Sequence, residues 1–89
     1  MVRYWMECEG IVQGVGFRYF VYQIANLLDL TGTVRNLDNG RVEIEVQGEE
    51  EALAQFQIRL NKGNGYSEIH HVSIRSMTIQ PHERSFEIE

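Results

Sequence analysis

The feature that most constrains the fold is a change of hydrophobic period around residues 13–18. Ahead of this segment, residues 2–9 alternate between apolar and polar side chains, which predicts a strand with one buried face. The apolar face of this strand comprises Val2, Tyr4, Met6 and Cys8. From residue 17 onward the apolar residues recur at helical spacing and form one broad stripe. That stripe comprises Phe17, Phe20, Val21, Ile24, Leu27 and Leu28.

The turn between strand and helix has the composition of an anion-binding loop. Gly14 and Gly16 allow the left-handed backbone angles that such a loop needs. The first turn of the helix presents unpaired N–H groups at the positive end of its dipole, and Arg18 adds a permanent cation there. We therefore expect a phosphate-binding loop. Its backbone donors are the N–H groups of Gln13, Gly14, Val15, Gly16, Phe17 and Arg18.

Common nucleotide-binding motifs do not match this loop. A dinucleotide fingerprint requires a third glycine where the chain has Tyr19, and the Gly-Lys-Ser/Thr triplet of a Walker loop is absent. The loop therefore suits a single small phosphoryl group better than a nucleotide. A plain strand-to-helix turn, with glycines for steric reasons only, is the alternative that the local sequence leaves open.

Size and charge restrict the classes of partner. The 89 residues, 43% of them hydrophobic, make one domain spanning 1–89. The net charge of −5 disfavours nucleic acid, whose binding depends on many Lys and Arg contacts, and it disfavours anionic membranes. No apolar run approaches the ~20 residues needed to cross a bilayer. The first residues lack the apolar core of a secretory signal, so we expect a cytoplasmic protein.

The sequence predicts neither a disulfide nor a metal site. Cys8 is the single cysteine, and its place on the apolar face of the first strand indicates a small buried hydrophobe rather than a nucleophile. His70 and His71 are adjacent, so in a strand their side chains point to opposite faces. No cluster of residues has the spacing of known metal ligands. We therefore expect no metal and no other cofactor.

Strand and helix patterns continue to alternate along the rest of the chain. Asp38-Asn39-Gly40 predicts a hairpin turn, because Asn and Gly tolerate positive φ. The expected elements are a strand at 2–9, a helix from Phe17 that ends at Gly32, hairpin strands at 33–37 and 41–47, a helix that opens at 48–51 and stops at 63–65, a strand at 71–79 and a short strand at 85–88. This βαββαβ order with a short C-terminal strand predicts a two-layer α+β sandwich with a mainly antiparallel sheet.

Two segments resemble the signatures of a known enzyme family. Residues 10–18, Gly-Ile-Val-Gln-Gly-Val-Gly-Phe-Arg, closely resemble the first signature of the acylphosphatase family. Residues 32–42 resemble its second signature, with Gly48 following at the expected distance. The resemblance implies a ferredoxin-like fold and hydrolysis of the carboxyl–phosphate bond of acyl phosphates to a carboxylate and inorganic phosphate. We also expect the protein to be a monomer.

The resemblance further implies roles for two side chains. The catalytic arginine of the family matches Arg18, and its catalytic asparagine matches Asn36. We expect the Arg18 guanidinium to clamp two phosphoryl oxygens and the Asn36 amide to orient the attacking water. Inorganic phosphate is then expected to inhibit competitively. Without the resemblance, Asn36 would be a turn-entry residue that bonds the backbone of its own hairpin.

Three positions depart from the family pattern. Thr33 stands where an aromatic residue is usual, which would weaken packing beside the site, and Cys8 stands where an aliphatic residue is common. The stretch at 63–67 lacks the proline that the corresponding family loop generally carries. None of these departures removes a catalytic group.

Two other functions share parts of the pattern. A regulatory module that only binds phosphate would need the same loop without a positioned water. An RNA-recognition domain shares the βαββαβ order, but it stacks bases on aromatic residues of a central strand. The corresponding strand here, residues 41–46, carries carboxylates and no aromatic residue.

Overall fold

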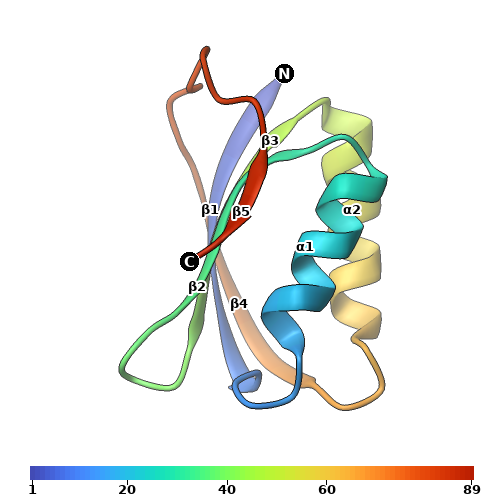
Figure 1. The fold of residues 1–89 in the computed structure, drawn as a ribbon, viewed down its shortest axis with the longest axis vertical. Helices are drawn as coiled ribbons and strands as arrows, with labels where there is room; N and C mark the ends of the chain where they lie inside the picture. Colours follow the sequence, from blue (N-terminus) through green and yellow to red (C-terminus); the bar gives the residue numbers. More distant parts are fainter.

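A five-stranded sheet covered on one face by two helices makes up the protein in this computed structural model, which describes all residues 1–89 (Figure 1). The elements are β1 (Val2–Ile11), α1 (Phe17–Leu27), β2 (Thr31–Asn36), β3 (Val42–Gly48), α2 (Glu50–Lys62), β4 (Glu68–Ser76) and β5 (Phe86–Ile88). The strand order is β4-β1-β3-β2-β5. All neighbouring strands are antiparallel except β2 and β5, which are parallel, so the sheet is mixed. The expected ferredoxin-like α+β sandwich is confirmed.

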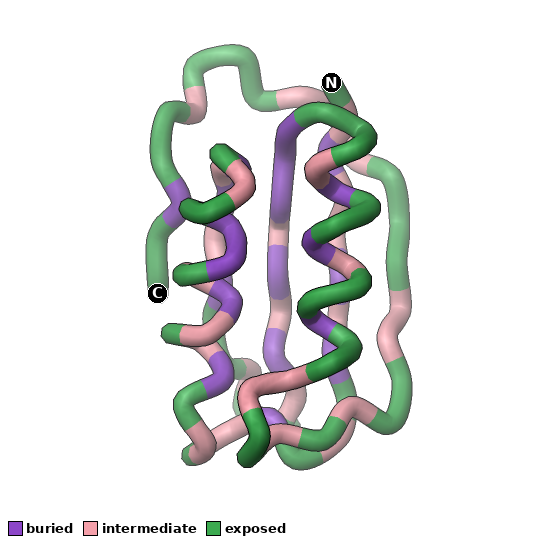
Figure 2. Tube along the Cα trace, turned by 90° about the vertical axis from the view of Figure 1, so that its right-hand side faces the viewer, coloured by how far each residue is buried: buried purple, intermediate pink, exposed green.

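The hydrophobic core lies between the helices and the sheet. Figure 2 views the molecule from the helix side and shows both helices in front of the sheet. The alternating residues Val42, Ile44 and Val46 of β3 face this core and are all fully buried. Cys8 is also fully buried, as expected, and burial raises the pKa of its thiol to about 12. Neither helix combines the length and apolarity needed to cross a bilayer.

The first helix ends earlier than the sequence predicted. It stops at Leu27, and the chain turns at Asp29, whose φ of 55° is left-handed. Gly32 therefore does not end the helix but lies inside β2, where a Cβ would collide with the backbone carbonyl of Glu45 on β3. The predicted stripe is also wrong at Leu27, which is 64% exposed, whereas Ala25 is buried.

The edge strands differ from the prediction in their bounds. β4 covers Glu68–Ser76 rather than residues 71–79, because its pairing with β1 runs from Ser76, opposite Tyr4, to Glu68, opposite Ile11. A bulge at Glu9 and Gly10 interrupts this pairing. The short final strand is confirmed as β5, and Phe86 anchors it in the core. Its pairing with β2 brings the last residues of the chain next to α1.

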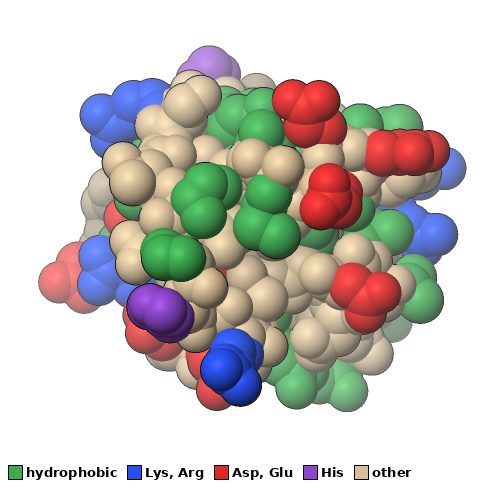
Figure 3. Space-filling view, turned by 90° about the horizontal axis from the view of Figure 1, so that it is seen from above, with side chains coloured by type: hydrophobic (Ala, Val, Ile, Leu, Met, Phe, Trp, Pro, Cys, Tyr) green, Lys and Arg blue, Asp and Glu red, His purple; other side chains and the backbone are tan.

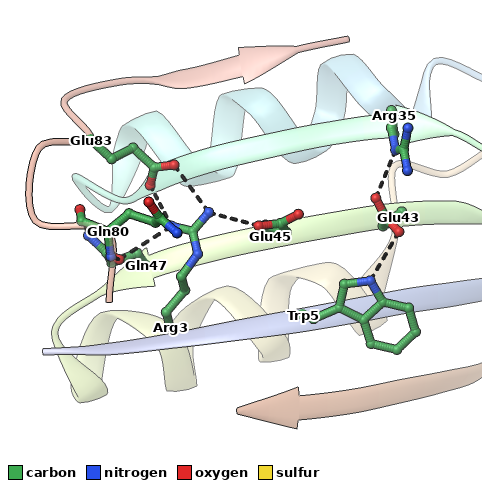
Figure 4. A network of polar contacts seen from close by, with 8 residues as sticks. All are labelled: Arg3, Trp5, Arg35, Glu43, Glu45, Gln47, Gln80 and Glu83. Atoms are coloured by element: carbon green, nitrogen blue, oxygen red, sulfur yellow. Dashed lines mark hydrogen bonds and ion pairs between the residues drawn. The ribbon is translucent and has the colours of Figure 1, made fainter. Parts of the chain in front are cut away.

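The face of the sheet away from the helices carries a polar network (Figure 4). Arg3 of β1 is at its centre, with a side chain only 3% exposed. Its guanidinium donates to Glu45 on β3 at 3.0 Å and to Glu83 at 2.8 Å. Glu83 belongs to the β4–β5 connection, so Arg3 fastens this connection to the sheet.

Thr33 lies on this same open face. It pairs with Glu45 across β2 and β3, and directly paired residues share a face of the sheet. Asn36, three positions further along the strand, is on the other face. The expectation that Thr33 weakens packing beside the site is therefore wrong, because its side chain points away from that side of the sheet.

Candidate active site

The connection between β1 and α1 is an irregular loop with free backbone donors. Gly14 and Gly16 both have a left-handed φ of 74°, which confirms the conformational role predicted for them. Gly16 is the N-cap of α1, and no side chain caps the helix there. The first bond of the helix runs from the Phe20 N–H to the Gly16 carbonyl. Consequently, none of the N–H groups of residues 13–19 donates to an acceptor within the protein.

A cavity of about 210 Å³ opens beside this loop. It is lined by Val12, Gly14, Gly16, Phe17, Arg18, Tyr19, Asn36 and Ile88. Figure 1 shows why residues from separate parts of the sequence meet here: the β1–α1 and β2–β3 connections lie at the same end of the sheet. The cavity thus brings the two predicted catalytic residues, Arg18 and Asn36, to one place. Figure 3 views the opposite end of the molecule, where acidic, basic and apolar side chains are mixed.

Arg18 lies in the first turn of α1 and is half-buried. Its Nη1 donates to the main-chain oxygen of Glu89 at 2.9 Å, which leaves other guanidinium donors free. Arg3, Arg35 and Arg41 each form an ion pair with a glutamate, but Arg18 pairs with no Asp or Glu side chain. Its positive charge, close to the positive end of the helix dipole, therefore favours an anion in the cavity.

Asn36 is the last residue of β2 and is exposed. Its side-chain amide makes no hydrogen bond within the protein, so it does not tie the hairpin as a turn-entry residue would. Asn39 performs that role instead, since its Oδ1 accepts the Arg41 N–H at 2.9 Å. The Asn36 amide is left with a free acceptor and free donors at the cavity.

Two of the residues predicted to form the loop have other tasks. The Gln13 amide donates to the carbonyls of Leu37 and Arg41 at 2.8 and 2.9 Å, and so ties the loop to the β2–β3 hairpin. Val15 packs its side chain against the core. Neither residue lines the cavity, although their N–H groups are free of protein acceptors.

The sequence did not predict that Val12, Tyr19 and Ile88 line the cavity. Tyr19 follows Arg18 in the first turn of α1, so its position next to the site could have been inferred. Ile88 carries no such signal, because its proximity depends on the parallel pairing of β5 with β2. The structure contains no group of three or more His, Cys, Asp or Glu side chains that could hold a metal ion.

Comparison with known proteins identifies the family. A family model described as Acylphosphatase matches residues 4–88. The acylphosphatase of Clostridium beijerinckii is 43% identical over 89 residues, covering 100% of this chain and 99% of the relative. The crystal structure of acylphosphatase from Bacillus subtilis matches with a TM-score of 0.95 at 38% identity, covering 100% and 99% of the two chains. An acylphosphatase structure from Coxiella burnetii has a TM-score of 0.91 at 28% identity, covering 99% and 92%.

These matches extend over nearly the whole of each protein compared, in sequence as well as in fold. They confirm the resemblance carried by residues 10–18 and 32–42. Hydrolysis of acyl phosphates follows as the class of activity. The chain belongs to the acylphosphatase family.

Proposed function

We propose that the cavity binds the phosphoryl group of an acyl phosphate and that two side chains divide the chemistry. The backbone N–H groups of residues 13–18 and the Arg18 guanidinium hold the phosphoryl oxygens. Asn36 orients the water that attacks phosphorus. The observation that carries this proposal is that the Asn36 amide, free of protein partners, shares one cavity with Arg18 and with unpaired backbone donors.

The chemistry of an acyl phosphate requires few protein groups. Its leaving group is a carboxylate whose conjugate acid has a pKa of about 4, so it departs without a general acid. The remaining task is to neutralise charge on the phosphoryl oxygens and to place a water in line with the breaking bond. Free N–H groups at a helix start and one guanidinium supply the first requirement. An amide is a poor base, so Asn36 contributes by positioning the water.

The product bears the same phosphoryl oxygens as the substrate. Inorganic phosphate should therefore compete for the cavity and inhibit the enzyme. We also propose that the protein acts as a monomer in the cytoplasm, without a metal, nucleic acid or a membrane as partner. Light scattering after size-exclusion chromatography tests the monomer, and activity in the presence of a chelator tests metal independence.

Turnover of benzoyl phosphate tests the assignment of the two residues. Arg18→Ala and Asn36→Ala should each lower kcat/KM by at least about 10²-fold, since each removes a group that acts on the transition state. Arg59→Ala is the matched control for the arginine, because Arg59 is exposed on α2 and forms no ion pair. Asn39→Ala is the control for the asparagine, because Asn39 lies in the same hairpin but does not line the cavity.

Three results would contradict the proposal. Full activity in either site variant would remove that residue from the mechanism. Activity that disappears with a chelator would introduce a metal. Phosphate binding without any turnover of benzoyl phosphate in the unsubstituted protein would instead favour the module that only binds phosphate.

A further inference from the structure

The connection between α2 and β4 touches the phosphate-binding loop. In Figure 1 this connection lies at the same end of the molecule as the β1–α1 loop. Asn64, its second residue, donates a hydrogen bond from Nδ2 to the Val15 carbonyl at 2.8 Å. Since residues 15 and 64 are far apart in sequence, this bond joins two otherwise separate loops.

The orientation of the Asn64 amide is determined by its neighbours. Its Oδ1 accepts the backbone N–H groups of Tyr66 and Ser67 at 2.9 and 2.8 Å. Only an oxygen can accept these two bonds, so the nitrogen of the amide faces the Val15 carbonyl. The Asn64 side chain thus has two roles. Its oxygen orders residues 63–67, which lack the family proline, and its nitrogen binds the neighbouring β1–α1 loop.

The bond to Val15 has a consequence for the next N–H group. The peptide between Val15 and Gly16 is trans, so its carbonyl and its N–H point in opposite directions. A Cβ on Gly16 would lie 3.8 Å from Asn64 Nδ2, so this side of Gly16 faces Asn64. With the carbonyl held toward Asn64, the Gly16 N–H is directed away from Asn64, and Gly16 is one of the residues that line the cavity.

We propose that Asn64 is a positioning residue that holds the Val15–Gly16 peptide with its N–H directed at the bound phosphoryl group. This inference rests on the proposed phosphate-binding role of the loop. Gly16 tolerates both signs of φ, so without a restraint this peptide can rotate at little cost. The rotated peptide would present a carbonyl oxygen to an anion. The Asn64 bond excludes that arrangement before the substrate binds, which keeps the donor preorganised.

Asn64→Ser tests the inference without a change of charge. A serine hydroxyl can still accept an N–H group of the turn, but it is too short to reach Val15. Inorganic phosphate is the probe, titrated while the amide signals are followed by ¹H–¹⁵N NMR. We expect the Kd for phosphate to rise about tenfold, as for one hydrogen bond to a charged group. We also expect the phosphate-induced shift of the Gly16 amide to shrink, while the Tm stays close to that of the unsubstituted protein.

Two further variants make the result decisive. Ser67→Ala is the matched control in the same loop, because Ser67 Oγ accepts only the Asn64 N–H at 3.4 Å and makes no bond to residues 12–18. It should leave the phosphate affinity unchanged. Asn64→Ala removes every side-chain bond of Asn64 and should weaken phosphate at least as much as Asn64→Ser.

The outcomes separate this inference from the proposed function. An unchanged Kd and Gly16 shift in both Asn64 variants, with phosphate binding lost in Arg18→Ala, would overturn the role of Asn64 alone. Phosphate binding that persists in Arg18→Ala, or no binding by the unsubstituted protein, would overturn the proposed site itself. An equal loss of affinity in Ser67→Ala would assign the effect to the loop as a whole and would also refute the specific role of Asn64.

Discussion

Replacing Arg3 by methionine should destabilise the protein more than removing the arginine of any exposed ion pair. Arg3→Met keeps an unbranched apolar stem but removes the guanidinium between Glu45 and Glu83 (Figure 4). Burial lowers the pKa of the Arg3 guanidinium, but the bonds to the two glutamates outweigh it and the net shift is upward. The ion pairs therefore compensate for the burial of this charge. Their loss leaves two neighbouring carboxylates without a cation.

The size of the effect follows from the burial of the three groups. Removing one partner of a buried ion pair costs about 3–5 kcal/mol. The Glu45 and Glu83 side chains are still 30% and 19% exposed, so they recover part of their hydration once Arg3 is gone. We therefore expect a loss of about 3 kcal/mol, near the lower end of that range. For a domain of this size, such a loss lowers the Tm by about 12–24 °C.

Urea unfolding monitored by far-ultraviolet circular dichroism measures this loss. The midpoint should fall while the slope m stays constant, because the surface exposed on unfolding is unchanged. Arg35→Met is the matched control. Arg35, like Arg3, forms an ion pair on this face, with Glu43 at 2.8 Å, but its side chain is 51% exposed. Solvent screens such a pair, so the control should lose only a small fraction of the stability lost in Arg3→Met. Equal losses in the two variants would refute the reasoning from burial.

Three further predictions concern a glycine, the cysteine and a glutamate. Gly32→Ala should lower the free energy of unfolding in urea much more than Gly40→Ala. Both residues have positive φ, but only at Gly32 would a Cβ collide with backbone atoms. Equal losses in the two variants would contradict this reasoning. Burial raises the pKa of the Cys8 thiol to about 12, so this thiol should resist a thiol reagent in the folded protein and react once the protein unfolds. Rapid labelling of the native state would contradict its burial. The hydrogen bond from Arg35 lowers the pKa of Glu43 below its ordinary value of 4.5. The stability that Glu43 contributes is therefore complete above the unfolded-state pKa and is lost as the pH falls through the lower folded-state pKa. The difference in unfolding free energy between the native protein and Glu43→Gln should shrink over that acidic interval, and a constant difference would contradict the shift.

Features that depend on neighbours in the sequence were predictable. The alternation of residues 2–9 identified β1, and the turn at 38–40 identified the hairpin of β2 and β3. The glycines at 14 and 16 identified the loop at the start of α1 because their left-handed backbone is a local property. Arg18 and Asn36 were assigned by resemblance, and the fold brings them to one cavity because the β1–α1 and β2–β3 connections lie at the same end of the sheet.

Features that depend on distant contacts were not predictable in the same way. In the alternation of β1, Arg3 lies on the same polar face as Glu7. Arg3 is nevertheless buried, because the β4–β5 connection brings Glu83 over it. Ile88 reaches the cavity through the pairing of β5 with β2. Asn64 has the local signature of a turn residue, and only the packing of its loop against the β1–α1 connection reveals the bond to Val15.

In the proposed mechanism, Arg18 binds the phosphoryl group whereas Asn36 acts on the water. A comparison of phosphate affinity with turnover in Asn36→Ala tests this division most directly. We expect kcat for benzoyl phosphate to fall at least about 10²-fold while the Kd for inorganic phosphate stays within about twofold of the native value. A loss of phosphate affinity as large as the loss of kcat would show that Asn36 binds the phosphoryl group itself and would contradict the proposed mechanism.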